Sequence, residues 1–229
     1  MAVSQIKNSV FLHKASHLYY TPWEYDTTNN IWKPGANTYD IVEILADTIA
    51  IEQGDPTTDN IDWEFGDTPL LSSSTKGERT VTAACIDMSF DIMKNVFGWT
   101  VDASSIMASE AATGESYATI CVMFHSTAAP IVVMPKVSMN AKTTIGTLKT
   151  STGQAELSGT AMSAYISYTD NAAGTAHTAN ATTEFAFVKP VDGGTISICN
   201  TTPSGSITAV AIADIDTETN GEFKLVTHS

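Results

Sequence analysis

Short segments in which apolar and polar residues alternate dominate this chain. Apolar side chains recur there at every second position, which is typical of half-buried strands. Turn-forming residues such as the Asn220-Gly221 pair separate the segments. The segments expected to be strands are residues 9–20, 40–53, 78–90, 117–124, 131–139, 154–168, 184–188, 195–199, 207–214 and 222–226. Many short strands with regular turns predict an all-β sandwich or barrel.

Residues 90–98 are the exception, because their apolar residues recur with a helical period. The residues on this face are Met93, Val96 and Phe97. Ser89 or Asp91 can cap the beginning of a helix, and Gly98 can end it. The pattern therefore predicts one short α-helix on an otherwise β fold.

The pattern in residues 40–53 leaves two interpretations. Ile49 and Ile51 favour a long strand, because β-branched residues suit strands. Glu43 and Asp47, however, interrupt the alternation. A helix over residues 41–50 is therefore the alternative to the strand that we favour.

Two long segments show little periodicity. Residues 1–39 are expected to form an N-terminal arm and loop, because Pro22, the Asn29-Asn30 pair, Pro34 and Gly35 mark turns within residues 21–37. Residues 55–77 are polar and acidic, and loops longer than about 15 residues are uncommon unless they are functional. We expect a β-sandwich domain over residues 40–190 that carries this long loop. Residues 191–229 are expected to form a C-terminal β extension or to belong to the same domain.

The charge balance excludes some classes of protein. The chain has 11 Lys and Arg residues against 25 Asp and Glu residues, and Arg79 is its single arginine. Proteins that read nucleic-acid sequence need basic residues for phosphates and bases, and anionic membranes also attract basic residues. Nine of the acids lie within residues 40–67, which contain no Lys or Arg. Neither sequence-specific nucleic-acid binding nor a membrane partner is expected.

Other features bear on location. No segment approaches the ~18 apolar residues that a membrane span requires. The N-terminus lacks the basic-then-apolar pattern of a signal peptide. Three widely spaced cysteines, Cys85, Cys121 and Cys199, are expected to be free thiols in a reducing compartment.

No motif predicts a catalytic residue, a metal site or a cofactor. His13 and His17 have the spacing of two zinc ligands on a helix, but Lys14 stands where a zinc protease has glutamate. The carboxylates of residues 55–64 lack the spacing of an EF-hand. Nucleophile-elbow and phosphate-binding glycine motifs are absent from the sequence. We therefore do not expect an enzyme, although a hydrolase that uses the acidic cluster is one alternative.

Several segments, in their order along the chain, carry a resemblance to a known family. They are residues 51–57 (IEQGDPT), 61–67 (IDWEFGD), Gly77 before a strand, the expected helix at 90–98, 133–139 (VMPKVSM) and 157–161 (LSGTA). In this order they resemble the tail tube (major tail) proteins of long-tailed bacteriophages. The resemblance covers roughly residues 40 to 190.

The resemblance implies a self-assembling structural protein of the virion. It implies a β-sandwich with a helix on its flank that closes into homohexameric rings, and rings that stack into the tail tube. Assembly is then expected in the cytoplasm of the host bacterium, with tape-measure and tail-end proteins as partners. Genomic double-stranded DNA is expected to pass through the channel during ejection without specific binding.

In such a tube the loop and the arm are the expected contacts between copies. Large apolar residues in exposed loops suit the core of an interface. The expected anchors are Trp63, Phe65, Leu70 and Leu71 in the loop and Trp23, Tyr25 and Trp32 in the arm. Alternatively, these residues hold the two segments onto their own domain.

The acidic run has two interpretations as well. Acidic loops keep proteins soluble. In a tube, an acidic channel would repel DNA, which carries one charge per ~1.7 Å, within a Debye length of ~8 Å, so that DNA slides through. The candidate channel acids are Glu43, Asp47, Glu52 and Asp55.

Two alternatives to a tail tube protein remain besides the hydrolase. One is another phage structural protein, such as a tail hub, a ring or connector protein or a head-decoration protein. The other is a carbohydrate-binding β-sandwich, which would require an export signal and aromatic residues exposed on one face.

Overall fold

The structure is a computed structural model that describes residues 14–41, 44–45, 47–61, 71–87, 89–109, 116–144, 153–171 and 176–228. These residues form antiparallel strands and one short helix, which confirms the all-β fold class. The helix is α1 (Phe90–Asn95). The strands are β1 (Ala15–Asp26), β2 (Ile31–Pro34), β3 (Tyr39–Asp40), β4 (Ala50–Gln53), β5 (Thr57–Ile61), β6 (Leu71–Thr75), β7 (Arg79–Cys85), β8 (Thr100–Val101), β9 (Ala108–Ser109), β10 (Tyr117–Phe124), β11 (Ile131–Thr144), β12 (Gln154–Met162), β13 (Ala164–Thr169), β14 (Thr178–Thr183), β15 (Ala186–Val188), β16 (Thr195–Cys199), β17 (Val210–Thr217) and β18 (Phe223–Thr227).

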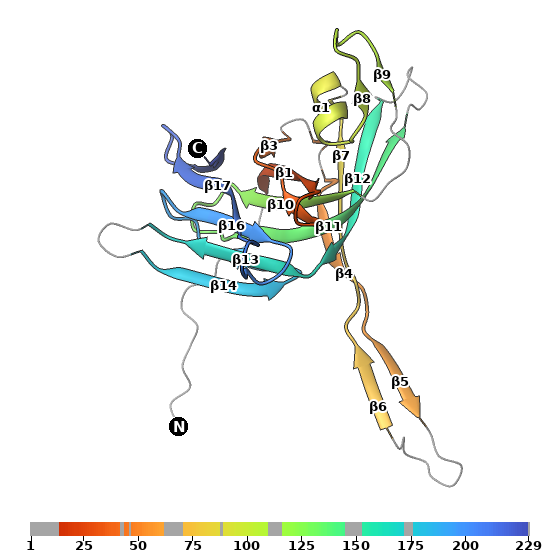
Figure 1. Cartoon of the computed structure of the whole chain (residues 1–229), viewed down its shortest axis with the longest axis vertical. Coiled ribbons are helices and arrows are strands. Elements are labelled where there is room, and N and C mark those ends of the chain that lie inside the picture. The colour runs from red at the N-terminus through yellow and green to blue at the C-terminus, as the bar shows by residue number, and fades with distance from the viewer. Residues whose placement is uncertain are drawn as a thin grey trace.

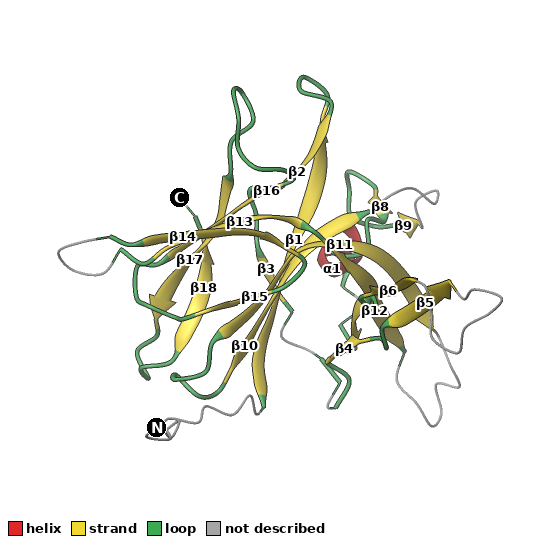
Figure 2. Ribbon diagram, turned by 90° about the horizontal axis from the view of Figure 1, so that it is seen from below, coloured by secondary structure: helices red, strands yellow, loops and turns green. Residues whose placement is uncertain are grey.

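Two sheets make up the body of the molecule (Figure 1). The main sheet has the order β2-β1-β10-β11-β12-β7-β4, with β3 also paired to β1 and β15 to β11. The second sheet has the order β14-β13-β16-β17-β18. Two further strand pairs, β5–β6 and β8–β9, form separate two-stranded sheets, and in Figure 2 both lie toward the β12 side of the molecule.

The main sheet has a hydrophobic core on each of its faces. Leu18 and Tyr20 contribute to one core, whereas Tyr19 between them contributes to the other. All three side chains are at most 3% exposed, because successive residues of a strand point to opposite faces. The core around Tyr19 lies between the two sheets and includes Ile166 and Ile198 of the second sheet. The body is therefore a sandwich whose main sheet is buried on both sides.

Residues 39–53 join the two ends of the main sheet. The Ile41 amide donates to the Leu18 carbonyl of β1 (2.9 Å), and Ile44 forms a bridge with Cys85 of β7. The sheet therefore curls around the core that contains Leu18. Neither the single strand nor the helix expected over this segment is observed in its described part. Asp47 has a φ of 62°, which no strand accommodates, so β3 and β4 are separate.

The short helix expected near residues 90–98 is confirmed. The Ser89 hydroxyl caps its beginning by accepting a hydrogen bond from the Ile92 amide. Gly98 has a φ of 67°, which favours glycine and ends the helical turn. Val96 is 4% exposed and belongs to the core inside the curled sheet. The helix therefore covers that core.

The segment 154–168, expected as one strand, is two strands in different sheets. Leu157 and Ala161 are buried in β12, and Ala164 and Ile166 are buried in β13. The buried residues have odd numbers in β12 and even numbers in β13. The change occurs at the exposed Ser163, where the chain passes from the main sheet to the second. Ser163 is therefore a corner of the sandwich.

The described part of residues 1–39 is not an irregular arm. β1 is a long strand of the main sheet, in which Thr21 is 1% exposed and Pro22 lies opposite Ala118 of β10. Pro34 ends the edge strand β2, where the missing amide hydrogen costs no ladder bond. The prolines in this segment therefore mark strand positions and not a loop.

The C-terminal strands do not form a separate extension. β16 pairs with β13, and Ile198 stands opposite Ile166. Strands on both sides of residue 190 therefore complete one five-stranded sheet.

We expect Gly159→Ala to destabilise the sandwich. A Cβ at Gly159 would lie 2.5 Å from Val137 Cγ1 and 2.7 Å from the Ser138 carbonyl oxygen. Overpacking of this kind costs about 1–3 kcal/mol of unfolding free energy. Urea denaturation measures the change, with Gly153→Ala as the control, because a Cβ at Gly153 meets no atom within 4 Å. Equal stability of the two variants would contradict this prediction.

Candidate functional site

The β5–β6 hairpin projects away from the body of the molecule (Figure 1). Its five pairs run from Thr57↔Thr75 to Ile61↔Leu71. All of its described side chains are exposed: Thr57, Thr58, Asp59, Ser72, Ser73, Ser74 and Thr75. A two-stranded sheet alone is at best marginally stable in water. The expected loop over residues 55–77 is therefore a hairpin that the described part of its own chain leaves uncovered on both faces.

Two glycines bring the hairpin strands into close contact at its root. A Cβ at Gly77 would lie 2.0 Å from the Gly54 carbonyl oxygen, so no side chain fits there. The Gly54 amide donates to the Glu78 carbonyl at 2.8 Å. β4 and β7 therefore continue into the hairpin as a closely paired root.

Polar side chains fasten this root to the body. The Lys76 ammonium pairs with Glu184. The Arg79 guanidinium donates to Gln53 Oε1 at 2.6 Å and lies 4.0 Å from the centre of the Phe185 ring. Stacking of this kind favours arginine over lysine. The single arginine of the chain therefore stabilises the base of the hairpin, a role that the sequence analysis did not predict.

We expect Gly77→Ala to disturb the hairpin root while the body stays folded. The added methyl group meets backbone, which cannot move aside as a side chain can. Because the root lies at the end of the β4–β7 ladder, the strands can separate locally there. Hydrogen exchange should show faster exchange of the Gly54 amide by about tenfold or more, the equivalent of about 1.4 kcal/mol of local opening. Unchanged protection of that amide relative to Gly153→Ala would disprove the assignment.

The structure places the loop anchors only in part. Trp63, Phe65 and Leu70 lie outside the described residues. The backbone of Leu71 pairs with Ile61 at the far end of the hairpin, but its side chain is outside the description. The structure does not test whether these residues bind another copy.

The arm anchors lie together in one aromatic group on the body. Trp23 is 6% exposed, and its indole N–H donates to Thr119 Oγ1 at 3.0 Å. The Trp32 ring packs edge-on against Tyr25 and Tyr117, with ring centres 5.6 and 5.1 Å apart. Tyr25 alone of the three anchors is exposed, at 49%. Trp23 therefore stabilises its own sheets.

A buried lysine stands beside this aromatic group. Lys136 is 7% exposed, and its Nζ lies 4.2 Å from the Tyr117 ring centre and 5.1 Å from that of Trp23. Nζ also donates to Oδ1 of Asn200, which follows β16, at 2.8 Å. Lys136 thus links the main sheet to the second sheet. A lysine inside the apolar run of residues 131–139 was the available sequence signal for this role.

The acidic candidates are placed in part too. Glu43 lies outside the described residues, whereas Asp47, Glu52 and Asp55 are exposed. Ile51 packs against the core, so its neighbour Glu52 in the same strand points away from the core. On the same outward face, side chains align across β4, β7, β12 and β11. These are Glu52, Thr80, Thr160 and Ser138 in one row and Ala50, Thr82, Ser158 and Asn140 in the next.

This outward face, which we call the hydroxyl face, contains Glu52 and hydroxyl groups in its two rows, and the next position on the same side of β11 is the buried Lys136. Comparison with protein-family models, with curated proteins and with solved structures finds no match. The hairpin, the hydroxyl face and the fold are therefore the features that bear on function.

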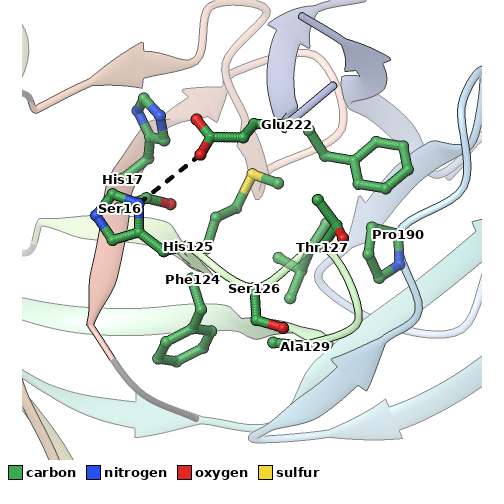
Figure 3. A pocket seen from close by; sticks show the side chains of 12 residues that line it. Ser16, His17, Phe124, His125, Ser126, Thr127, Ala129, Pro190 and Glu222 are labelled. Atoms are coloured by element: carbon green, nitrogen blue, oxygen red, sulfur yellow. Dashed lines mark ion pairs between the residues drawn. The ribbon is translucent and has the colours of Figure 1, made fainter. Parts of the chain in front are cut away.

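Histidine chemistry does not suggest another site. His13 lies outside the described residues, and His17 lies in a strand, where its Nδ1 is 2.8 Å from Asp40 Oδ2. His125 faces Glu222 at 4.0 Å across a cavity of about 10 Å³, room for a single water (Figure 3). Among the described residues, no serine hydroxyl bonds to His125, and no three His, Cys, Asp or Glu residues form a group able to hold a metal.

The three cysteines are free and buried, as the interpretation as unpaired thiols predicted. Burial raises the pKa of the Cys121 thiol to about 12, so its reactive thiolate form is disfavoured. Within the described part of the chain, no helix is long and apolar enough to cross a membrane.

Proposed function

We propose that this protein is a bacteriophage tail tube protein, whose copies form hexameric rings that stack around a channel for DNA. The observation that carries the proposal is the projecting β5–β6 hairpin, which no described residue of its own chain covers. The all-β sandwich with one short flanking helix supports it, together with the resemblance in the sequence.

The hairpin supports assembly because it is an extended element fixed only at its root. Its edges and faces are available to a second copy, and its root is held by Gly54, Gly77 and Arg79. A hairpin that contacts a different surface of the next copy makes a head-to-tail interface. Such interfaces give closed rings or open stacks, depending on the rotation between copies.

The hydroxyl face is the part of the molecule that we assign to the channel wall. Thr80, Thr160 and Ser138 offer neutral hydroxyl groups, and Glu52 adds negative charge. DNA phosphates would find no Lys or Arg in these rows to bind, and the charge of Glu52 would repel them within about 8 Å. DNA would therefore pass without adhering.

The proposal places the protein in the virion tail, with assembly in the cytoplasm of the host bacterium. Tape-measure and tail-end proteins would be its partners besides other copies of the chain. It requires neither a catalytic group nor a cofactor.

Electron microscopy of the purified full chain tests the proposal. We expect stacked rings with a central channel, at concentrations where the subunits associate. A protein that stays monomeric at every concentration and salt condition would refute it. A single ring or a trimer would instead indicate a tail hub, a connector or a head-decoration protein.

A further inference from the structure

An apolar groove of about 320 Å³ lies between the β13–β14 end of the second sheet and β15. We call it the β14–β15 slot. Its apolar lining consists of Ile166, Tyr168, Ala179, Ala181, Phe187 and Val188. Ile166 and Val188 are 4% and 5% exposed, whereas Phe187 is 58% exposed. The slot therefore combines a buried apolar floor with an aromatic ring open to solvent.

The strand beside the slot has an unprotected edge. β14 is the edge strand of its sheet, and its sequence, Thr-Ala-Asn-Ala-Thr-Thr, has neither charge nor proline. Folded proteins usually protect such edges against pairing with other chains. On β18, the opposite edge of the sheet, the Tyr19 hydroxyl accepts from the Leu225 amide. The β14 edge is thus suited to receive another segment of chain.

The slot also has a positive charge at its rim. Lys189 lines it, is exposed, and makes no ion pair with any carboxylate among the described residues. A segment that fits should therefore bring apolar side chains to the floor and acidic side chains to Lys189.

One segment of this chain has that pattern. Residues 61–65 read Ile-Asp-Trp-Glu-Phe, a strict alternation of apolar and acidic residues at the end of β5 and beyond it. We propose that the β14–β15 slot receives residues 61–65 of a second copy of this chain. Ile61, Trp63 and Phe65 contact the slot, and Asp62 and Glu64 lie beside Lys189. This inference rests on the proposed function and identifies the surface that receives the hairpin.

The occupant must come from another copy. The slot adjoins the root of the hairpin of its own chain. Phe187 of the slot packs edge-on against Phe185, and the Arg79 guanidinium at the root lies over the Phe185 ring. The hairpin then runs away from the body over five paired positions (Figure 1), about 17 Å at the usual rise per residue. Ile61, at the far end of the described hairpin, is therefore far from the slot of its own chain, and each copy offers one hairpin and one slot.

A charge exchange tests the pairing. We expect Lys189→Glu to reduce the protein found in tubes by about tenfold or more, because many weak contacts act together in a stack. Adding Asp62→Lys and Glu64→Lys to this variant should restore assembly. Lys94→Glu, the same change at an exposed lysine of α1, is the matched control and should assemble normally. Sedimentation and negative-stain microscopy measure the tubes.

Disulfide trapping identifies the occupant. Phe187→Cys protein mixed with Trp63→Cys protein should form a covalent pair of one copy of each, because the three native cysteines are buried. Met107→Cys in place of Phe187→Cys is the control for random collision, since Met107 is 61% exposed, close to the 58% of Phe187. Trapping of Phe187→Cys by Ser4→Cys instead would overturn the assignment and give the slot to the N-terminal residues.

The outcomes separate this inference from the proposed function. Normal tubes from Lys189→Glu without the Phe187–Trp63 disulfide would overturn the slot and leave the tube protein standing. Absence of tubes from the unmodified chain would overturn both.

Discussion

Replacing Trp63 by alanine, or deleting residues 62–71, is expected to yield a folded subunit that does not form tubes. None of the described side chains of the hairpin that carries these residues belongs to either core. Its removal should therefore change the free energy of unfolding by no more than about 0.5 kcal/mol, as for ordinary surface changes. A tryptophan at the centre of an interface commonly contributes 2 kcal/mol or more, about a 30-fold change in each contact.

Thermal unfolding and electron microscopy together measure this effect. Ile106→Ala is the control, since Ile106 is 80% exposed and lies between β8 and β9, away from the hairpin (Figure 1). Normal tubes from the Trp63 variant would remove the hairpin tip from the interface. Loss of tubes together with loss of folding would show that residues 62–71 stabilise the subunit itself.

Trp23→Ala is expected to have the largest effect on stability, a loss of about 3–5 kcal/mol. The buried indole packs between the two sheets, donates to Thr119 and lies beside the Lys136 ammonium. Its removal leaves a cavity and a weaker environment for the buried charge. The Thr119 hydroxyl loses its donor and keeps only its own hydrogen bond to the Pro135 carbonyl. Tyr25→Ala, at an exposed position of the same strand, should cost less than about 1 kcal/mol.

Chemical denaturation of both variants decides between two roles for Trp23. A stable Trp23→Ala subunit that fails to assemble would make Trp23 an anchor between copies, the role expected from the sequence. A double-mutant cycle with Lys136→Met measures the contribution of the ring to the lysine, expected at about 1–2 kcal/mol for a desolvated pair.

The sequence predicted best the strands whose apolar residues are buried. The expected bounds of β10 and β16 agree with the structure at both ends, because apolar residues in these strands meet a core. The helix was predicted from the spacing of Met93, Val96 and Phe97, with Ser89 or Asp91 as its N-cap and Gly98 as its C-cap. Ser89 is the N-cap in the structure, whereas the C-cap is Val96 and Gly98 follows it with a φ of 67°. Local sequence patterns were sufficient for these segments, because their structure depends mainly on residues that are near one another in the sequence.

The failures have equally local causes. The described side chains of β5 and β6 are all exposed, so these strands show no alternation of buried and exposed residues. At Ser163 the chain passes from one sheet to the other, and the buried positions change from odd to even numbers. A single continuous strand would keep the same positions buried throughout. Pro22 suggested a loop, although the long β1 contains it. Residue type alone does not distinguish these cases.

The candidate site was partly visible in the sequence. The acidic run and the long uncovered segment were apparent, and Glu52 and Asp55 are indeed exposed. The roles of Arg79 and Lys136 were missed, since their partners Phe185 and Asn200 lie far along the chain. Contacts of that kind are created by the topology and leave no pattern in either segment alone.

The way in which the hairpin leaves the body determines how the subunit would bear tension. β5 continues β4 and β6 continues β7, and β7 is paired with β12 at six positions. A pull along the hairpin acts along β7 and loads these hydrogen bonds together, in shear. Bonds loaded in parallel resist far greater force than bonds opened one after another from an end. A tube built on such hairpins would stretch and bend as a whole before any one subunit came apart.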